Sequence, residues 1–584
     1  MNIAQLGIMR GVTAGQQTQR AIARYTGYSL GKVNRLATEL QEQGFVDSNL
    51  QLTNAGQHYL ATHHPQRAII LAAGYGMRMV PINTEEPKGL LEVNGEPLIE
   101  RLIKQLHAVG IDDIHIVVGF MKEHYEYLID QYHVKLIVNT HYGDYKNLYS
   151  LYLARPFLAD SYVAPCDIWF RNNPFSTVED QSWYLFSNHQ TEASVWRVTN
   201  RGTVKRISKG SRGDQMVGIA YLNAPAGKKL ANLLQTAVGN ELMLSQFWEQ
   251  ALDDDGRFLL RGKLIADNDF SEINSYEQLR DIDFNSSHLQ NEAMRVIEQA
   301  LGTDLRGIKN IRVLKKGMTN RSFFFEHDGH RYIMRIPGEG TGKLINRQEE
   351  YDVYQELKGT AWTERVLYLN PHNGYKLSAF IEDAHNASAS NWDEVTRCMA
   401  MLRKLHHSGF KVRHAFRLYD QIEFYEGLRK EPSAYQDYAA VKDRVDRLRP
   451  FIFQHAKPQV LCHIDANPDN FVFDRNDRLY LIDWEYAGMQ DPDIDVAMFA
   501  IYAMYNQSQL DKLIDTYYQG QCDRTTRLKI YAYVAACGLL WSNWCEYKQS
   551  LGLDFGEYSL AQYRYAKEYS SLVLDTLEKE NAQD

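Results

Sequence analysis

The sequence predicts a multidomain protein with a small, mainly α N-terminal domain, a central α/β domain and a C-terminal α+β domain of two lobes. Three observations support this prediction. The chain has 584 residues, more than one hydrophobic core usually organises. Short helical patterns give way to apolar strands near residue 65. Strands and helices then alternate to about residue 285, whereas strands precede helices after residue 300.

The composition is that of a globular protein, with 44% hydrophobic and 23% charged residues. A net charge of -9 gives no global reason to expect a nucleic-acid or membrane partner. No apolar run approaches the roughly 20 residues that span a bilayer, and the N-terminus lacks the layout of a secretory signal. The six cysteines form no CxxC pair, which favours reduced thiols. We therefore expect a cytoplasmic protein without a membrane span.

Residues 1–64 predict helices over TQRAIARYTG and SLGKVNRLATELQEQGF, a strand-like VDSNLQLT and a further helix. Ser29 is expected to cap the second helix. This order resembles the winged helix-turn-helix of bacterial regulators, in which the second helix, here with Lys32, Asn34 and Arg35 near its start, contacts DNA. Protein docking or scaffolding is the alternative, because the segment holds only five Lys/Arg against three Asp/Glu.

After a short linker at 63–66, residues 67–285 predict a Rossmann-like α/β domain. The apolar strands RAIILAAG, DIHIVVGF and VKLIVNT alternate with helices such as PLIERLIKQLHAVG. This rhythm is typical of a parallel sheet with helices on both faces. A helical linker, SSHLQNEAMRVIEQALG, is expected to follow.

The first strand of this domain leads into AAGYGMR, and PKGLLEVNGEPLIE follows shortly after. Glycines let the backbone approach a triphosphate closely, and basic side chains balance its charge. Two glycines after a strand are weak evidence alone. Together with a later acidic strand end, the segments resemble the sugar-phosphate nucleotidyltransferase superfamily. The nucleotide-binding residues that this implies are Ala73, Gly74 and Gly76, with Arg78 and Lys88 as catalytic cations.

Nucleotidyl transfer brings two anionic phosphates together, so Mg²⁺ and basic residues must offset their repulsion. The resemblance implies a metal-binding aspartate at a strand end, and Asp167 in APCDI follows the apolar SYVAP. A second ligand is implied in FSEINSY. Members of the superfamily often have a carboxylate where this chain has Asn274, so both Asn274 and Glu272 are candidates.

Within the superfamily, NTHYGDYKNLYSL resembles the choline-phosphate cytidylyltransferases of bacterial surface-decoration pathways, which implies that Asn147 contacts the nucleotide. Lys146 stands where those enzymes often have another asparagine. A quaternary ammonium donates no hydrogen bond, so its site needs aromatic faces and a carboxylate. Trp196 and Tyr221 are predicted to line that site, with Trp169 and Tyr184 as further candidates, although each alone is more typical of core packing.

Residues 300–384 are rich in predicted strands and residues 385–584 in helices, which is the layout of a protein-kinase-like domain. HIDANPDN has the HxDxxxxN spacing of a kinase catalytic loop. Asp465 would orient or deprotonate the attacking hydroxyl, and Asn470 would bind Mg²⁺. Thirteen residues after Asn470, LIDWE supplies Asp483 as a second metal carboxylate.

The segment LKKGMTNRSF resembles the nucleotide loop of choline and aminoglycoside kinases. ATP binding is therefore implied for Gly317, Thr319 and Asn320. Arg335 takes the position of the phosphate-binding lysine, with Glu350 as its helix partner and Glu349 as the alternative. LRKLHH matches bacterial choline kinases, and His406 is expected to support the catalytic loop structurally.

The acceptor site is predicted from four further residues. Glu485 and Tyr486 follow the metal aspartate, and Trp541 and Trp544 lie three residues apart on one helical face. Such a pair is usually core packing. In the kinases that this segment resembles, the late helix lines the acceptor pocket, and an aromatic box with a carboxylate suits a trimethylammonium group.

The combined prediction is a bifunctional enzyme that makes CDP-choline. The partners are choline, phosphocholine, ATP and CTP, with Mg²⁺ as cofactor; DNA binding by residues 1–64 and a homo-oligomer stay open. One alternative is the same chemistry on ethanolamine, another amino-alcohol or a sugar phosphate, with an aminoglycoside as the acceptor of the kinase. The ammonium of ethanolamine donates hydrogen bonds, so its site would favour carboxylates over stacked indoles. Another is a ligand-sensing transcriptional regulator, which would not need the catalytic carboxylates.

Overall fold

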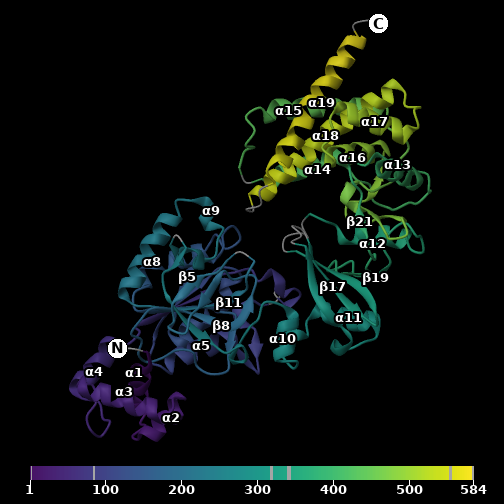
Figure 1. The fold of residues 1–584 in the computed structure, drawn as a ribbon. Coiled ribbons are helices and arrows are strands. Elements are labelled where there is room, and N and C mark those ends of the chain that lie inside the picture. The colour runs from purple at the N-terminus through teal and green to yellow at the C-terminus, as the bar shows by residue number, and fades with distance from the viewer. Residues whose placement is uncertain are drawn as a thin grey trace. The chain divides into compact units, whose positions relative to one another are not determined.

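The computed structural model describes residues 1–581 except 2, 83–85, 209, 255, 316–319, 339–343, 430 and 551–554. The chain divides into two compact units, Met1–Asn291 and Glu292–Asp584, which are coloured purple to blue-green and teal to yellow in Figure 1. Within the described ranges, no helix has both the length and the apolarity to cross a membrane.

Four helices and a short bridge form the N-terminal domain. The helices are α1 (Ile3–Thr13), α2 (Gln19–Thr26), α3 (Leu30–Glu42) and α4 (Asn54–Thr62). Ser29 caps α3 as expected, accepting a hydrogen bond from the Lys32 N–H. The strand-like segment is reduced to a bridge between Val46 and Leu52. The sequence did not predict α1, because Gly7 and Gly11 interrupt its helical pattern; a Cβ at Gly11 would lie 3.3 Å from the Tyr25 ring.

This helical domain packs against a loop of the α/β domain. Val178 of that loop is buried in the core of the helical domain. Arg10 on α1 binds the Val178 carbonyl and lies 3.2 Å from Glu179, and the Tyr59 hydroxyl on α4 donates to Asp180 at 2.6 Å. His64 contacts the carbonyl oxygens of Thr177 and Gly110 at 2.6 and 3.1 Å. The segment 63–66 therefore lies fixed between two domains that form one unit.

A seven-stranded sheet organises the α/β domain, in the order β14-β8-β11-β6-β1-β4-β5. Its strands are β1 (Arg67–Ala72), β4 (Asp113–Val118), β5 (Lys135–Val138), β6 (Ser161–Pro165), β8 (Trp183–Thr191), β11 (Gly213–Leu222) and β14 (Arg261–Ile265). The pairs of β1 with β4 and β6 are parallel, as expected, but β11 is antiparallel to β6 and β8. The sheet is therefore mixed and not wholly parallel. The sequence did not predict this, because an apolar pattern does not reveal the direction of a strand.

Helices cover both faces of this sheet. On one face lies α5 (Leu98–His107), whose Leu102 and Leu106 pack with Ile70. On the other lie α7 (Asn147–Leu153) and α8 (Ala224–Ala237), whose apolar residues pack with Ile69. The remaining elements are α6 (Tyr127–Tyr132), α9 (Glu241–Leu244), α10 (Tyr276–Ile282), β2 (Glu92–Val93), β3 (Glu96–Pro97), β7 (Ile168–Phe170), β9 (Trp196–Val198), β10 (Val204–Arg206), β12 (Asp253–Asp254), β13 (Arg257–Phe258) and β15 (Phe270–Glu272).

The second unit begins with α11 (Glu292–Leu301) and a five-stranded antiparallel sheet in the order β16-β17-β18-β20-β19. Its other elements are β16 (Lys309–Lys315), β17 (Asn320–His327), β18 (His330–Pro337), α12 (Arg347–Glu356), β19 (Val366–Leu369) and β20 (Lys376–Ala379). The apolar face of α11 is buried and packs on β18 and β19. The helix predicted as a linker is thus part of this lobe, which starts at Glu292 and not at residue 300.

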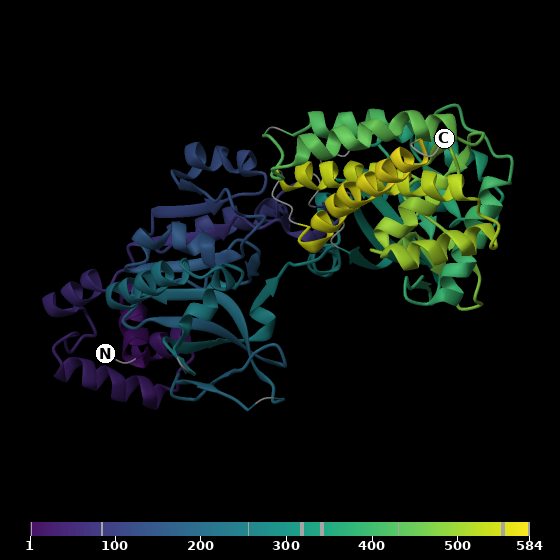
Figure 2. The same ribbon diagram turned by 90° about the horizontal axis from the view of Figure 1, so that it is seen from above.

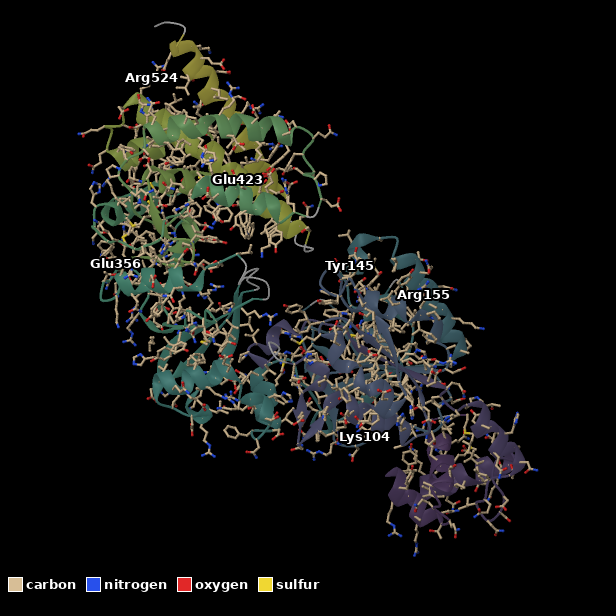
Figure 3. All side chains as sticks on the ribbon, turned by 180° about the vertical axis from the view of Figure 1, so that it is seen from behind. Lys104, Tyr145, Arg155, Glu356, Glu423 and Arg524 are labelled. Atoms are coloured by element: carbon tan, nitrogen blue, oxygen red, sulfur yellow. The ribbon has the colours of Figure 1, made fainter. Side chains whose placement is uncertain are left out.

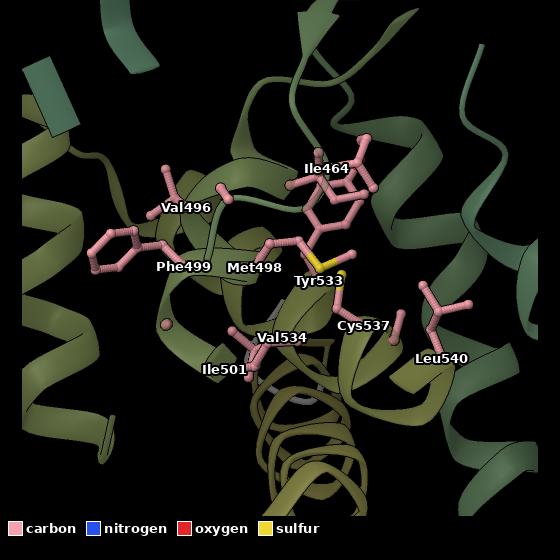
Figure 4. Close-up of a cluster of buried hydrophobic side chains, with 14 of the residues drawn as sticks. Ile464, Val496, Met498, Phe499, Ile501, Tyr533, Val534, Cys537 and Leu540 are labelled. Carbon is pink, nitrogen blue, oxygen red and sulfur yellow. The ribbon is translucent and has the colours of Figure 1, made fainter. Parts of the chain in front are cut away.

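A helical lobe follows, as predicted. Its elements are β21 (His385–Asn386), α13 (Trp392–His406), α14 (Leu418–Gly427), α15 (Tyr438–Gln454), β22 (Val460–Cys462), β23 (Phe471–Phe473), β24 (Leu479–Leu481), β25 (Gly488–Gln490), α16 (Asp493–Tyr502), α17 (Gln507–Tyr518), α18 (Arg524–Gln549) and α19 (Glu557–Asn581). Buried on nearly all sides, α18 packs along α14, α15, α16 and α19, the yellow helix in Figure 2. Figure 4 labels Ile464, Met498 and Cys537 of this core. The core thereby reaches the segment that follows β22.

Candidate active sites

The loop after β1 leaves its backbone open toward a ligand. Ala73 is buried, and a Cβ built on Gly74 would meet no atom within 4 Å. Gly76 has a φ of +62°, a left-handed conformation that favours glycine. Lys88 Cβ lies 3.7 Å from the position of a Cβ on Gly76, so the predicted glycine loop and the predicted lysine are neighbours.

Four predicted residues from distant parts of the chain meet beside this loop. Asn274 Oδ1 accepts hydrogen bonds from Lys88 Nζ at 2.6 Å and Arg78 Nη2 at 2.9 Å. Lys88 also forms an ion pair with Asp167. The backbone holds the group together, because β15 pairs with β7 and the Ile273 N–H donates to the Asp167 carbonyl at 2.9 Å.

The donor set fits a magnesium ion. Oxygens of Asp167 and Asn274 already converge on the Lys88 ammonium, and oxygen ligands of this kind are those that Mg²⁺ prefers. Glu272, the last residue of β15, pairs with Ile168 and lies two residues before Asn274 in the chain. Burial raises the pKa of a second acidic group, Glu249, and the charge of Glu272 adds to this effect.

Glu249 is a buried carboxyl that the sequence analysis missed. The Tyr184 hydroxyl donates to Glu249 Oε1 at 3.1 Å, and a Cβ at Gly218 would lie 3.1 Å from Pro165 Cγ and 4.0 Å from that oxygen. Burial raises the pKa of Glu249 to about 7. The only sequence signal for Glu249 was its position next to a tryptophan in FWEQAL. The residues around Glu249 come from β6, β8 and β11, and only the fold brings them together.

Two of the predicted aromatic residues, Trp196 and Tyr221, belong to the hydrophobic core of the α/β domain. Trp196 is 5% exposed and packs edge-on against Phe258 at 5.1 Å. Tyr221 is 2% exposed and pairs across the ladder with Tyr162, five residues before Asp167 along the chain. Both side chains pack in the hydrophobic core, so their predicted contact with the acceptor stays a prediction. Tyr184, the further candidate, is the aromatic residue beside Glu249.

Asn147, which is predicted to contact the nucleotide, binds a neighbouring segment of the chain. Its Oδ1 accepts the Trp248 N–H at 2.9 Å, so it positions the segment that carries Glu249. The tyrosines around it form a ladder, in which Tyr145 and Tyr149 lie 5.2 Å apart between ring centroids. Figure 3 labels Tyr145 on this unit.

In the second unit, buried polar contacts fix the segment after β22. Asp495 on α16 accepts the N–H groups of His463 and Ile464 at 2.8 and 2.7 Å. Ile464 has a φ of +66°, unusual for a β-branched residue, and these bonds hold it there. His406 Nε2 lies 3.0 Å from Asp495 Oδ2, which confirms its structural position under the loop.

Asp465 and Asn470 face one another in this loop. Asn470 Nδ2 donates to the carbonyl and to Oδ2 of Asp465, both at 2.9 Å, and so leaves Asn470 Oδ1 for a cation. Burial raises the pKa of Asp465, and the nearby Asp483 adds to this effect. Asp483 and Asn470 are oxygen donors beside the same loop, so the residues present fit Mg²⁺ here as well.

Arg335 and Glu350 form a buried ion pair, with Nη1 to Oε1 at 2.6 Å and Nη2 to Oε2 at 2.8 Å. Arg335 Nη1 also lies 3.6 Å from Asp483 Oδ1. Burial would raise the pKa of Glu350, but Arg335 outweighs it and holds that pKa at about 2. The structure thus pairs Arg335 with Glu350 and not with Glu349. Sequence reasoning missed Arg347, which lies 3.1 Å from Glu350.

Glu485 lies among these cations. Its Oε2 is 3.4 Å from Arg347 and 3.8 Å from Arg335. Burial raises the pKa of Glu485 to about 8, and Asp483 contributes. The predicted acceptor carboxylate is therefore also linked to the residues that would hold the nucleotide.

The predicted tryptophans form part of an aromatic cluster beside Asp465. The Trp541 ring lies 5.6 Å from both Tyr486 and Tyr502 and 5.7 Å from Trp544. Trp541 and Trp544 are 4% and 8% exposed. Burial raises the pKa of Asp465, and a hydrogen bond from Tyr502 partly offsets this effect, so the cluster is in contact with the loop of Asp465. Tyr502 was not predicted, because it belongs to an apolar helix with no local motif.

Of the remaining residues that are predicted to bind the nucleotide, the structure describes one. Gly317 and Thr319 lie outside the described residues. Asn320 is the first residue of β17 and pairs with Pro337.

Comparison with known proteins assigns the two units to different families. The family model described as "MobA-like NTP transferase domain" matches residues 68–203. The family model described as "Phosphotransferase enzyme family" matches residues 310–533. A choline-phosphate cytidylyltransferase of Streptococcus pneumoniae is 33% identical over 221 residues, 37% of this chain and 96% of the relative. Protein LicA of Haemophilus influenzae is 30% identical over 266 residues, 42% of this chain and 75% of the relative.

A 2-aminoethylphosphonate cytidylyltransferase of Lancefieldella rimae is also similar, with 34% identity over 195 residues, 32% of this chain and 79% of the relative. Among solved structures, the choline kinase LicA from Streptococcus pneumoniae has a TM-score of 0.43 and 28% identity, covering 47% of this chain and 98% of that chain.

Proposed function

Because the chain belongs to the choline-phosphate cytidylyltransferase family through its first unit and to the LicA family through its second, we propose that it makes CDP-choline in two steps. The second unit would phosphorylate choline with ATP, and the first would couple the phosphocholine to CMP from CTP. The observation that carries this proposal is that each unit combines a phosphate-handling group of charges with an aromatic and carboxylate cluster.

In the first step, the choline hydroxyl oxygen attacks the γ-phosphorus of ATP and ADP leaves. Asp465 accepts the hydroxyl proton, which its raised pKa favours. Arg335, held by Glu350, binds the phosphate oxygens. Asn470 and Asp483 would hold Mg²⁺, which supplies positive charge against the phosphates. The residues act by positioning and by charge, as phosphoryl transfer requires.

The aromatic cluster supports choline as the acceptor. A trimethylammonium group forms no hydrogen bond and gains about 0.5–2 kcal/mol over an aromatic ring in a dry site. Trp541, Tyr486 and Tyr502 supply such faces next to Asp465. The cluster also excludes water, which would otherwise compete with choline for the γ-phosphate.

In the second step, a phosphate oxygen of phosphocholine attacks the α-phosphorus of CTP, and pyrophosphate leaves. This nucleophile is already anionic, so the step requires no general base. Lys88, Arg78, Asp167 and Asn274 therefore need not include one. Lys88 and Arg78 offset the repulsion between the two phosphates. Asp167, with Asn274 or Glu272, would hold Mg²⁺. Glu249 and Tyr184 would receive the trimethylammonium end.

The same first unit could serve a primary amine. The similar Lancefieldella protein is named for 2-aminoethylphosphonate, and a carboxyl such as Glu249 accepts hydrogen bonds from an ammonium. A panel of choline, ethanolamine and 2-aminoethylphosphonate, each with Mg²⁺, ATP and CTP and with products identified by mass spectrometry, distinguishes the alternatives. Choline should be converted with the highest kcat/KM; faster conversion of either amine would contradict the assignment.

Trp541→Leu should raise the KM for choline about tenfold, because the variant loses one cation–π contact with the trimethylammonium group. The KM for ATP should stay within about twofold of its original value. Steady-state kinetics with each substrate varied separately measures both. Trp392→Leu is the matched control, because Trp392 is another tryptophan of the same lobe and stacks on Tyr505 at 5.6 Å. Equal increases in both KM values would mean that Trp541 supports the fold and not the acceptor.

Glu249→Gln should raise the KM for phosphocholine about tenfold without changing that for CTP. In the unaltered protein this KM should fall as pH rises through about 7, because Glu249 ionises there. Comparison with the glutamine variant separates this effect from the titration of the substrate phosphate, which occurs near pH 6. A KM that keeps the same pH profile in both proteins would exclude Glu249 from cation binding.

The raised pKa of Glu249 also predicts how the stability of the Glu249→Gln variant depends on pH, which serves as a control. A carboxyl whose folded-state pKa is raised stabilises the fold below its ordinary pKa and loses that contribution as pH rises through about 7. Glu249→Gln should therefore increase Tm more at about pH 8 than at about pH 5. A variant that is less stable at both pH values would not be used for the kinetic comparison.

A further inference from the structure

Lys548 is a buried cation that neither step of the proposed function uses. It lies near the end of α18 and is 4% exposed, although lysine is seldom buried without a partner. Among the described residues, its ammonium has neither a hydrogen bond nor an ion pair. The nearby carboxylate Glu546 is bound instead to Arg429 and accepts the Ser433 hydroxyl at 2.8 Å. Lys548 is therefore an isolated charge at a buried position.

The Lys548 side chain faces the aromatic cluster beside Asp465. Its ammonium lies 5.6 Å from the centre of the Trp544 ring, which is one turn earlier on the same face of α18. That ring in turn lies 5.7 Å from Trp541. Burial lowers the pKa of Lys548, and the negative charge of Glu485 partly offsets this effect. The lysine thus interacts with both parts of the predicted acceptor site, the indole faces and the carboxylate.

These are the groups that would bind the trimethylammonium end of choline. Aromatic faces and a carboxylate attract either cation, and two positive charges repel one another more strongly in a site that excludes water. Glu485 already lies 3.4 Å from Arg347 and 3.8 Å from Arg335. Its single negative charge is therefore shared with two arginines before either Lys548 or choline is counted.

We propose that Lys548 is a resident cation of the acceptor site, which competes with a positively charged acceptor and moves away when that acceptor binds. Lys548 is the penultimate residue of α18, and its flexible side chain allows the ammonium to turn away from the ring. This role rests on the proposed phosphorylation of choline by the second unit. It makes Lys548 a residue that sets how tightly the site binds a cation, and it leaves uncharged acceptors unopposed.

Lys548→Met removes the charge and keeps most of the length of the side chain. The KM for choline should fall about tenfold, which corresponds to about 1.4 kcal/mol, because the repulsion between the two cations is lost. Steady-state kinetics of ATP-dependent choline phosphorylation measures this KM. A purely structural lysine would give the opposite result, since loss of its packing would raise the KM.

An uncharged analogue separates the effect of charge from that of size. The alcohol that has carbon in place of the choline nitrogen should inhibit the unaltered protein and Lys548→Met with Ki values within about twofold of each other, because it carries no charge to repel. Lys548→Arg keeps the positive charge and should keep the KM for choline within about threefold of its original value. An equal fall in this Ki and in the KM for choline would overturn the proposal, because Lys548 would then obstruct the site by its volume.

Lys512→Met is the matched control, because Lys512 also lies over a tryptophan of the same lobe, with its ammonium 3.9 Å from the centre of the Trp392 ring. Lys512 is exposed, and its loss should leave the KM for choline unchanged. Unaltered protein that does not phosphorylate choline would contradict both the proposed function and the role of Lys548. Normal turnover with a KM that is unchanged or raised in Lys548→Met would overturn the role of Lys548 alone.

Discussion

Asp465→Asn should lower the rate of ATP-dependent choline phosphorylation by about 10³-fold, because asparagine cannot accept the hydroxyl proton. The side chains are nearly the same size, and the bond from Asn470 Nδ2 to the residue 465 carbonyl, 2.9 Å long, does not depend on the carboxylate. The loop should therefore keep its shape. Cytidylyl transfer from supplied phosphocholine should proceed at its full rate. Radiolabelled ATP and CTP measure the two activities separately.

Asp469→Asn is the control for this variant, since Asp469 is an exposed carboxylate of the same loop. It should retain both activities. If Asp465→Asn removed both, the two steps would not be carried by separate sites. If it left phosphorylation within tenfold, another group would be the base.

Asp167→Ala should have the opposite effect, lowering cytidylyl transfer by about 10³-fold or more and leaving choline phosphorylation intact. The estimate corresponds to about 4 kcal/mol, since a bound divalent ion contributes several kcal/mol to the stabilisation of developing charge. The variant also leaves Lys88 without its ion-pair partner. The rate of pyrophosphate release with supplied phosphocholine and CTP measures the loss.

Asp112→Ala removes an exposed aspartate from the same unit and should change neither rate. Titration of Mg²⁺ gives a second readout, because Asp167→Ala should raise the Mg²⁺ concentration needed for half-maximal cytidylyl transfer. An unchanged Mg²⁺ requirement together with a full rate would place the metal elsewhere.

The sequence predicted those site residues whose partners are close in the chain. HIDANPDN encodes a loop whose donor and acceptor are five residues apart, so Asp465 and Asn470 could be paired by spacing alone. Trp541 and Trp544 share a helix face for the same reason. Lys88, Asp167 and Asn274 are distant in sequence, and only their resemblance to a known superfamily allowed them to be grouped.

The features that the sequence did not reveal have a common physical cause. Trp196 and Tyr221 sit in strands whose alternate residues face a core, where aromatic side chains are most often found. Glu249 and Arg347 acquire their roles from residues on other elements, Tyr184 in one case and Glu485 in the other. Strand direction, as in β11, is likewise a tertiary property that local patterns do not encode.

The most direct test of two sites acting in sequence is to supply one nucleotide at a time. Purified protein with Mg²⁺ and isotopically labelled choline should give labelled phosphocholine with ATP alone, no product with CTP alone, and labelled CDP-choline with both, as resolved by mass spectrometry. Choline that stays unmodified with both nucleotides, or phosphocholine that accumulates without CDP-choline in the presence of CTP, would contradict the account.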